Sequence, residues 1–205
     1  MSDRSNYFPA EEVSQQDFAV FEPLLSQIDR LLQTGPVTMA IEGGSAGGKT
    51  TLSRILESLY DTTVFHMDDF FLRPEQRTPQ RFAQPGGNID WERFLAEVLT
   101  PLKEHAPIEY KAFDCSSFTL KPPVVLTPSD LNIIEGAYSM HPELAGYYDL
   151  SVFLDISPDL QARRIRKRNL PALAERYFNE WIPMEHLYFE KLDVKKRCDI
   201  VINIG

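Results

Sequence analysis

Short apolar runs separated by stretches of helical periodicity make up most of the chain. Five of these runs predict β-strands, at residues 37–42, 63–67, 131–135, 151–155 and 199–204. Helices are expected at residues 17–34, 49–59, 91–104, 158–168 and 176–192, and the proline-rich and glycine-rich stretch 73–88 is expected to be a surface loop. Strands that alternate with helices predict an α/β fold, a five-stranded parallel sheet flanked by helices.

Length and composition place further limits on the chain. Its 205 residues, of which 43% are hydrophobic, predict a single domain over 1–205 in which residues 1–36 form an N-terminal helical extension. The formal net charge of -9 argues against binding to nucleic acid, which requires a basic face. Two cysteines, a first segment without signal-peptide features and no long apolar stretch favour a cytoplasmic protein with no membrane contact.

The segment "EGGSAGGKTT", residues 42–51, fits the phosphate-binding pattern G-x-x-x-x-G-K-[ST] and lies between a predicted strand and a predicted helix. Glycines let consecutive backbone N–H groups surround a phosphate, and the start of the helix adds its positive dipole end. Lys49 can reach the outer phosphates of a nucleoside triphosphate, and the Thr50 hydroxyl can bind Mg²⁺. The predicted nucleotide-binding residues are Gly43, Gly44, Ser45, Ala46, Gly47, Gly48, Lys49, Thr50 and Thr51. The alternative, a glycine-rich turn with a surface lysine, does not account for the complete motif.

Three acidic residues follow predicted strands. Asp68 and Asp69 lie in "FHMDDFF", and Glu135 ends the apolar run "LNIIE". Because ligands of parallel α/β sheets bind beyond the carboxyl ends of the strands, these acids are expected to face the same crevice as the phosphate loop. A carboxylate there can accept a proton from an attacking hydroxyl or hold the water shell of a metal. A helix-capping aspartate with a solvated neighbour is the structural alternative for the adjacent pair.

Four arginines in six residues, Arg163, Arg164, Arg166 and Arg168, lie on the predicted helix 158–168. Arg164 and Arg168 are four residues apart and therefore share one helix face. Guanidinium groups suit phosphate oxygens, and so many on one helix exceed what a solvated basic face needs in an acidic chain.

The ordered segments "EGGSAGGKTT", "HMDDFF", "GGNIDWERF", "NIIEGAY" and "DLSVFLDISPDLQARRIRKR" resemble the uridine kinase and phosphoribulokinase group of P-loop kinases, over about residues 37–168. "MDDFFLRPE" and "WIPMEHLYFE" also resemble nicotinamide riboside kinases. The resemblance implies that Asp68 is the base for the substrate's 5′-hydroxyl, that Asp90 grips ribose hydroxyls, and that Glu135 lies near Mg²⁺. It also implies that the arginine helix forms part of a lid, at about residues 163–180.

The chain departs from uridine kinases in "YKAFDCSSFTL", residues 110–120, where the expected base-reading histidine is missing. Tyr110 and Phe113 can still stack on a base, and Asp114, Ser116 or Ser117 can bind its edge. The predicted function is transfer of the γ-phosphoryl of ATP, with Mg²⁺, to the 5′-hydroxyl of a nucleoside, uridine or cytidine first. Asp68, Lys49, Arg164 and Arg168 are expected to be catalytic, and Arg164 is also expected to contact the substrate. Nicotinamide riboside, pantothenate and a sugar phosphate remain alternative acceptors, and an ATP-binding regulatory switch is the alternative outside enzymes.

Overall fold

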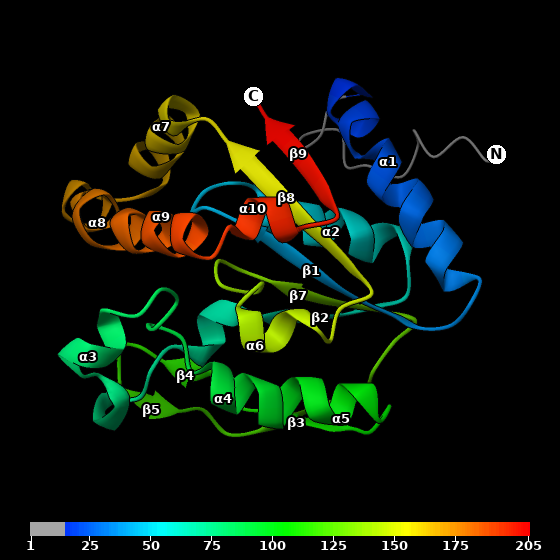
Figure 1. Ribbon diagram of the computed structural model, residues 1–205, viewed down its shortest axis with the longest axis horizontal. Helices are drawn as coiled ribbons and strands as arrows, with labels where there is room; N and C mark the ends of the chain where they lie inside the picture. Colours follow the sequence, from blue (N-terminus) through cyan, green and yellow to red (C-terminus); the bar gives the residue numbers. More distant parts are fainter. Residues whose placement is uncertain (1–14) are drawn as a thin grey trace.

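The computed structural model describes residues 15–205 and is built on one five-stranded parallel sheet (Figure 1). The strands run in the order β2-β7-β1-β8-β9, so the first strand of the sequence lies at the centre. All five predicted strands are present; their bounds are β1 Val37–Gly43, β2 Thr62–His66, β7 Leu131–Glu135, β8 Leu150–Ile156 and β9 Ile200–Ile204. The α/β class and the parallel sheet predicted from the apolar runs are confirmed.

Helices cover both faces of the sheet, which explains why its central strands are apolar at nearly every position. On one face, α1 (Gln15–Leu32) and α2 (Lys49–Leu59) pack against the side chains of Met39 and Ile41 in β1. On the other face, Ala40 belongs to a core that includes residues of α6 (Pro142–Ala145), α9 (Ile182–Lys191) and α10 (Val194–Arg197). The alternation along β1 therefore divides the core into two layers.

The predicted helices are present, with differences at their ends. The helix expected at 91–104 consists of α4 (Trp91–Phe94), a π-helical turn (Leu95–Leu99) and α5 (Thr100–Lys103). The helix at 158–168 is α7 (Pro158–Arg168). The last predicted helix begins earlier than expected, because Pro171 starts α8 (Pro171–Arg176), which continues through the π-helical turn Tyr177–Trp181 into α9.

The prediction that residues 73–88 form a surface loop was wrong in part. A 3₁₀ turn occupies Pro74–Gln76, and α3 spans Pro79–Phe82. The Thr78 hydroxyl caps α3 by accepting a hydrogen bond from the Arg81 amide at 3.1 Å, and Pro79 fits its first turn because that position needs no amide donor.

Residues 108–126, which lie between α5 and β7 in the sequence, form two short antiparallel ladders below the sheet in Figure 1 and are called the arm here. In the first, β3 (Ile108–Tyr110) pairs with β6 (Val124–Leu126); in the second, β4 (Phe113–Asp114) pairs with β5 (Thr119–Leu120). The sequence did not predict these strands because two or three residues are too few to show an alternating pattern. In the part of the chain that the structure describes, no helix is long and apolar enough to cross a bilayer.

Candidate active site

The loop between β1 and α2 has the backbone geometry of a phosphate cradle. Gly43 has φ 146°, and a Cβ atom there would lie 2.6 Å from the Leu154 carbonyl oxygen, so only glycine fits. Gly48, at φ 99°, precedes α2, whose first residue is Lys49. The positive end of the α2 dipole therefore faces the space that the loop encloses.

A cavity of about 740 Å³ opens over this loop and is called the nucleotide cavity here. Every loop residue from Ser45 to Thr51 lines it, whereas Gly43 and Gly44 are not among the lining residues. The Lys49 ammonium donates to the carbonyl oxygens of Gly43 and Gly44 at 2.8 and 3.1 Å. Two main-chain carbonyl groups of the loop thus hold the Lys49 ammonium in a position where it can contact a phosphate.

Helix α7 closes one side of the nucleotide cavity. Arg164 and Arg168 both line it, as their shared helix face predicts, and Lys167, which the sequence analysis did not single out, lies beside them. Arg164 Nη1 donates to the Ala46 carbonyl oxygen at 3.1 Å, and Gln161 Nε2 donates to the Ser45 carbonyl oxygen at 2.9 Å. Arg163 and Arg166 do not line the cavity; Arg166 lies over the Phe178 ring.

Glu135, at the end of β7, lies at the base of the nucleotide cavity. Its Oε1 accepts a hydrogen bond from the Thr50 hydroxyl at 3.2 Å and lies 2.7 Å from His66 Nδ1. Burial by itself would raise the pKa of Glu135, but the His66 hydrogen bond and the charge of Lys49 hold it below its usual range. The same hydrogen bond raises the pKa of His66. Glu135 is therefore an ionised carboxylate beside the loop hydroxyl.

The Thr50 hydroxyl and the Glu135 carboxylate fit a hard divalent cation such as Mg²⁺, which prefers hydroxyl, carboxylate, phosphate and water ligands. Among residues 15–205, no group of three or more His, Cys, Asp and Glu side chains is arranged to hold a metal ion. A magnesium ion at Thr50 and Glu135 would therefore take most of its ligands from phosphates and water.

The two adjacent aspartates after β2 face different surroundings. Asp69 accepts a hydrogen bond from the Tyr110 hydroxyl at 2.7 Å, and Tyr110 is buried. Asp68 lines the nucleotide cavity together with Lys49. Although Asp68 is exposed to this space, the protein around it withdraws water from the carboxylate and so raises its pKa, while Lys49 opposes the shift. Of the pair, Asp68 is the carboxylate that a ligand can reach.

A second cavity, of about 460 Å³, adjoins the first and is called the acceptor cavity here. Ser45, Lys49, Asp68 and Tyr177 line both cavities. Its apolar wall is mostly aromatic and consists of Phe71, Leu72, Phe82, Phe118, Ala137, Tyr138, Tyr177, Trp181 and Met184. Tyr110 and Phe113, expected to stack on a base, are buried outside the lining, and Cys115 and Phe118 of the arm line the cavity instead.

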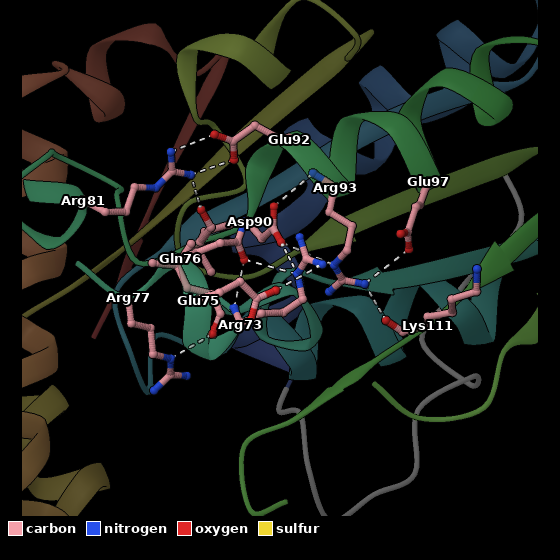
Figure 2. Close-up of polar contacts among 12 residues, drawn as sticks. Arg73, Glu75, Gln76, Arg77, Arg81, Asp90, Glu92, Arg93, Glu97 and Lys111 are labelled. Carbon is pink, nitrogen blue, oxygen red and sulfur yellow. Dashed lines mark hydrogen bonds and ion pairs between the residues drawn. The ribbon is translucent and has the colours of Figure 1, made fainter. Parts of the chain in front are cut away.

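Asp90, expected to grip ribose hydroxyls, is 1% exposed and does not line the acceptor cavity. It caps α4 by accepting from the Arg93 amide at 3.2 Å, and its Oδ2 lies 3.3 Å from Arg73 Nε and 3.7 Å from Arg93 Nε. Figure 2 shows the two arginines converging on this carboxylate. In this structure Asp90 organises the loop that precedes α4, and its contact with substrate stays a prediction.

Glu185 of α9 is a site residue that the sequence analysis did not identify. It lines the acceptor cavity, is 4% exposed, and accepts hydrogen bonds from the Ser45 amide at 2.9 Å and the Ser45 hydroxyl at 2.5 Å. It is also one of the carboxylates whose charge raises the pKa of Asp68. The sequence analysis marked its segment, "WIPMEHLYFE", by resemblance but gave Glu185 no role, because its contact with the loop between β1 and α2 depends on how α9 folds back over the sheet.

Glu42, the last acidic residue before the loop glycines, is completely buried beneath the site. Its two oxygens accept four hydrogen bonds, from the amides of Gly43, Tyr138 and Met140 and from the Tyr188 hydroxyl, at 2.9 to 3.2 Å. Burial raises the pKa of Glu42 to about 7, against the effect of these donors. The carboxyl group thus joins β1, the segment after β7, and α9.

Replacing Glu42 with glutamine should lower the free energy of unfolding by about 2 kcal/mol at pH 6, because an amide nitrogen would leave a buried backbone donor without an acceptor. The folded-state pKa of Glu42 lies above its unfolded value, so its contribution is full below the unfolded pKa and is lost as pH rises through about 7. The difference from the parent should therefore shrink at pH 8. Urea denaturation at both pH values, with the exposed Glu57→Gln as control, measures this. Equal stability at pH 6 would contradict it.

Comparison with known proteins adds to this geometry. The sequence model of the protein family described as Phosphoribulokinase / Uridine kinase family matches residues 38–170 of the chain. The chain is 28% identical over 188 residues to the uridine kinase of Streptococcus agalactiae serotype V, covering 83% of this chain and 88% of that protein. It is 29% identical over 187 residues to the uridine kinase of Brevibacillus brevis, and the match covers 83% of this chain and 86% of that protein. A solved structure described as a possible uridine kinase from Bacillus stearothermophilus has the same fold, with a TM-score of 0.60 and 24% sequence identity. The superposition covers 88% of this chain and 99% of that one.

Proposed function

The chain belongs to the phosphoribulokinase and uridine kinase family of P-loop kinases, and from this premise we propose that it transfers the γ-phosphoryl of ATP to the primary hydroxyl of a small alcohol. The observation that carries the proposal is the position of Asp68 and Lys49, which line both the nucleotide cavity and the acceptor cavity. A phosphoryl group on one side and a hydroxyl group on the other meet at these two side chains.

The backbone N–H groups of the P-loop and the Lys49 ammonium hold the phosphates, and Arg164 and Arg168 stabilise the charge that spreads over the transferred group. Asp68 accepts a hydrogen bond from the acceptor hydroxyl, orients it toward phosphorus, and takes its proton as the new P–O bond forms. When Mg²⁺ is bound at Thr50 and Glu135, it neutralises phosphate charge. Closure of α7 and the following segment excludes water and so limits hydrolysis of ATP.

Uridine and cytidine are the first acceptors to test, because the relatives described above are named uridine kinases. Nicotinamide riboside and other small metabolites with a primary hydroxyl are the alternatives. The aromatic wall of the acceptor cavity suits a flat or apolar group, whereas its residues from the arm differ from those expected for reading a pyrimidine.

The experiment is coupled measurement of ADP release from ATP-Mg²⁺ with each member of a panel of primary alcohols, followed by identification of the phosphorylated product. The proposal expects ADP release that depends on an acceptor and is matched by one equivalent of phosphorylated alcohol. A protein that binds ATP but releases ADP at the same rate with every acceptor and with none would instead be an ATP-binding switch.

A further inference from the structure

Four arginines lie in or beside the loop that joins β2 to α4, at positions 73, 77, 81 and 93. Three of them are paired with carboxylates, as Figure 2 shows. The pairs are Arg73 with Glu75 and Asp90, Arg81 with Glu92, and Arg93 with Asp90 and Glu97, all with nitrogen to oxygen distances of 2.7 to 3.7 Å. Pairing with an acid is therefore the rule for this segment.

Arg77 is the exception. Among residues 15–205 no carboxylate lies within 4.0 Å of its guanidinium, although the chain holds 30 acidic residues against 21 basic ones. Its Nε donates to the Leu72 carbonyl oxygen at 2.9 Å, and Figure 2 shows the side chain directed away from the cluster around Asp90. The positive charge of Arg77 therefore lies apart from the acidic side chains of its own loop.

The position of the Arg77 guanidinium is nevertheless well defined. Its central carbon lies 4.9 Å from the centre of the Phe118 ring and 5.8 Å from that of Phe113, two residues of the arm. Stacking on aromatic rings, together with the bond to Leu72, fixes the group before any ligand arrives. Nε donates to the main chain, and the guanidinium also hydrogen-bonds the Cys115 thiol. The donors left for a ligand are therefore the N–H groups of the two terminal nitrogens that the thiol does not use.

Arg77 lines the acceptor cavity, the same space into which Asp68 opens. The other arginine of this lining, Arg176, is paired with Glu180 at 3.1 Å. The charge of Arg77 and its hydrogen bond to the Cys115 thiol oppose the rise in the pKa of Cys115 that burial causes. The wall of the acceptor cavity thus holds the Asp68 and Glu185 carboxylates and an arginine, Arg77, that no carboxylate of residues 15–205 pairs with.

We propose that Arg77 binds an anionic group, a carboxylate or a phosphate, carried by the acceptor alcohol. The proposal rests on the kinase function proposed above and narrows its substrate class. A guanidinium offers two parallel N–H donors that match two oxygens of an anion, and the charge-assisted bonds are stronger than neutral ones. The acceptor then binds with its hydroxyl at Asp68 and its anion at Arg77, so neutral nucleosides are the weaker substrates.

The test uses pairs of alcohols in which one member carries an anionic group and the other does not, together with uridine and cytidine. In 4-hydroxybutyrate and 4-hydroxybutyramide the carboxylate is replaced by a neutral amide of similar size, and in glycerol 3-phosphate and glycerol the phosphate is removed. Binding to the ADP complex is measured by isothermal titration, and turnover by ADP release. In the parent, the anionic member of at least one pair should bind about 10- to 100-fold more tightly than its neutral partner. Comparison of the two pairs distinguishes a carboxylate from a phosphate.

Arg77→Gln should abolish that difference, leaving binding of the neutral partner and of ADP within about twofold of the parent. Arg176→Gln, the matched control from the same cavity, should retain the preference for the anion. The inference is overturned if neither anion is preferred, if uridine or cytidine is bound and phosphorylated best with no effect of Arg77→Gln, or if that variant weakens both members of a pair equally. Failure of the kinase function is a separate result, in which ATP binds but no alcohol, charged or neutral, is phosphorylated.

Discussion

Replacement of Lys49 with alanine should lower kcat by about 10³-fold or more, which is the scale of losing a charged donor aimed at a transferring phosphoryl group. Lys49 is the positive side chain that both the nucleotide cavity and the acceptor cavity share. Its ammonium is already held by two loop carbonyls at 2.8 and 3.1 Å, so it needs little rearrangement to meet a phosphate. Electrostatic stabilisation by a preorganised group is lost completely when the group is removed.

The fold should survive this change, because the Lys49 side chain is only partly buried and the left-handed φ angles of the loop lie at Gly43, Ala46 and Gly48, which the substitution leaves in place. Thermal unfolding of Lys49→Ala should therefore resemble that of the parent, with Lys191→Ala, an exposed lysine on α9, as the control for loss of one charge. Steady-state kinetics with the best acceptor and calorimetric binding of ATP-Mg²⁺ provide the measurement. A variant with near-normal turnover, or one that fails to fold, would contradict the role given to Lys49.

The parts of the molecule that the sequence predicted are those in which local pattern and tertiary environment agree. Strands buried on both faces need apolar residues at most positions, so β1 and β7 were recognisable as mostly apolar runs. The P-loop was recognisable for a similar reason. The backbone at Gly43 admits no Cβ atom, and a constraint of that kind leaves a residue type that can be read directly from the sequence.

The acceptor cavity could not be predicted in the same way. Its wall combines Phe118 from the arm, Trp181 from a π-helical turn, and Glu185 from α9, and no spacing in the sequence relates these three segments. The surroundings of Asp90 could not be predicted from the sequence either. The resemblance implied that Asp90 contacts substrate, and that contact stays a prediction, but nothing in the sequence showed that Arg73 and Arg93 lie beside its carboxylate. Partners of this kind are decided by packing between distant parts of the chain.

The substitution Asp68→Asn should lower kcat by about 10²- to 10⁴-fold, the usual contribution of a general base, while ATP binding stays nearly unchanged. Asparagine keeps the size of the side chain and can still accept a hydrogen bond from the acceptor, but it cannot take the proton. Asp69→Asn is the matched comparison, because its carboxylate accepts from Tyr110 and lies outside both cavity linings. Its effect on turnover should be milder and should be accompanied by a loss of stability.

The pH dependence of kcat gives a second measurement on the same residue. Desolvation, with the charges of Glu135 and Glu185, raises the pKa of Asp68, and a general base works only in its ionised form. The acid limb of the parent profile should therefore lie above pH ~4, the range of an ordinary aspartate, and activity should fall as pH drops through the raised pKa. In Asp68→Asn this limb should disappear from the residual activity. Full activity in Asp68→Asn beside an inactive Asp69→Asn would reverse the assignment of the base, and full activity in both would remove general-base catalysis from the proposed mechanism.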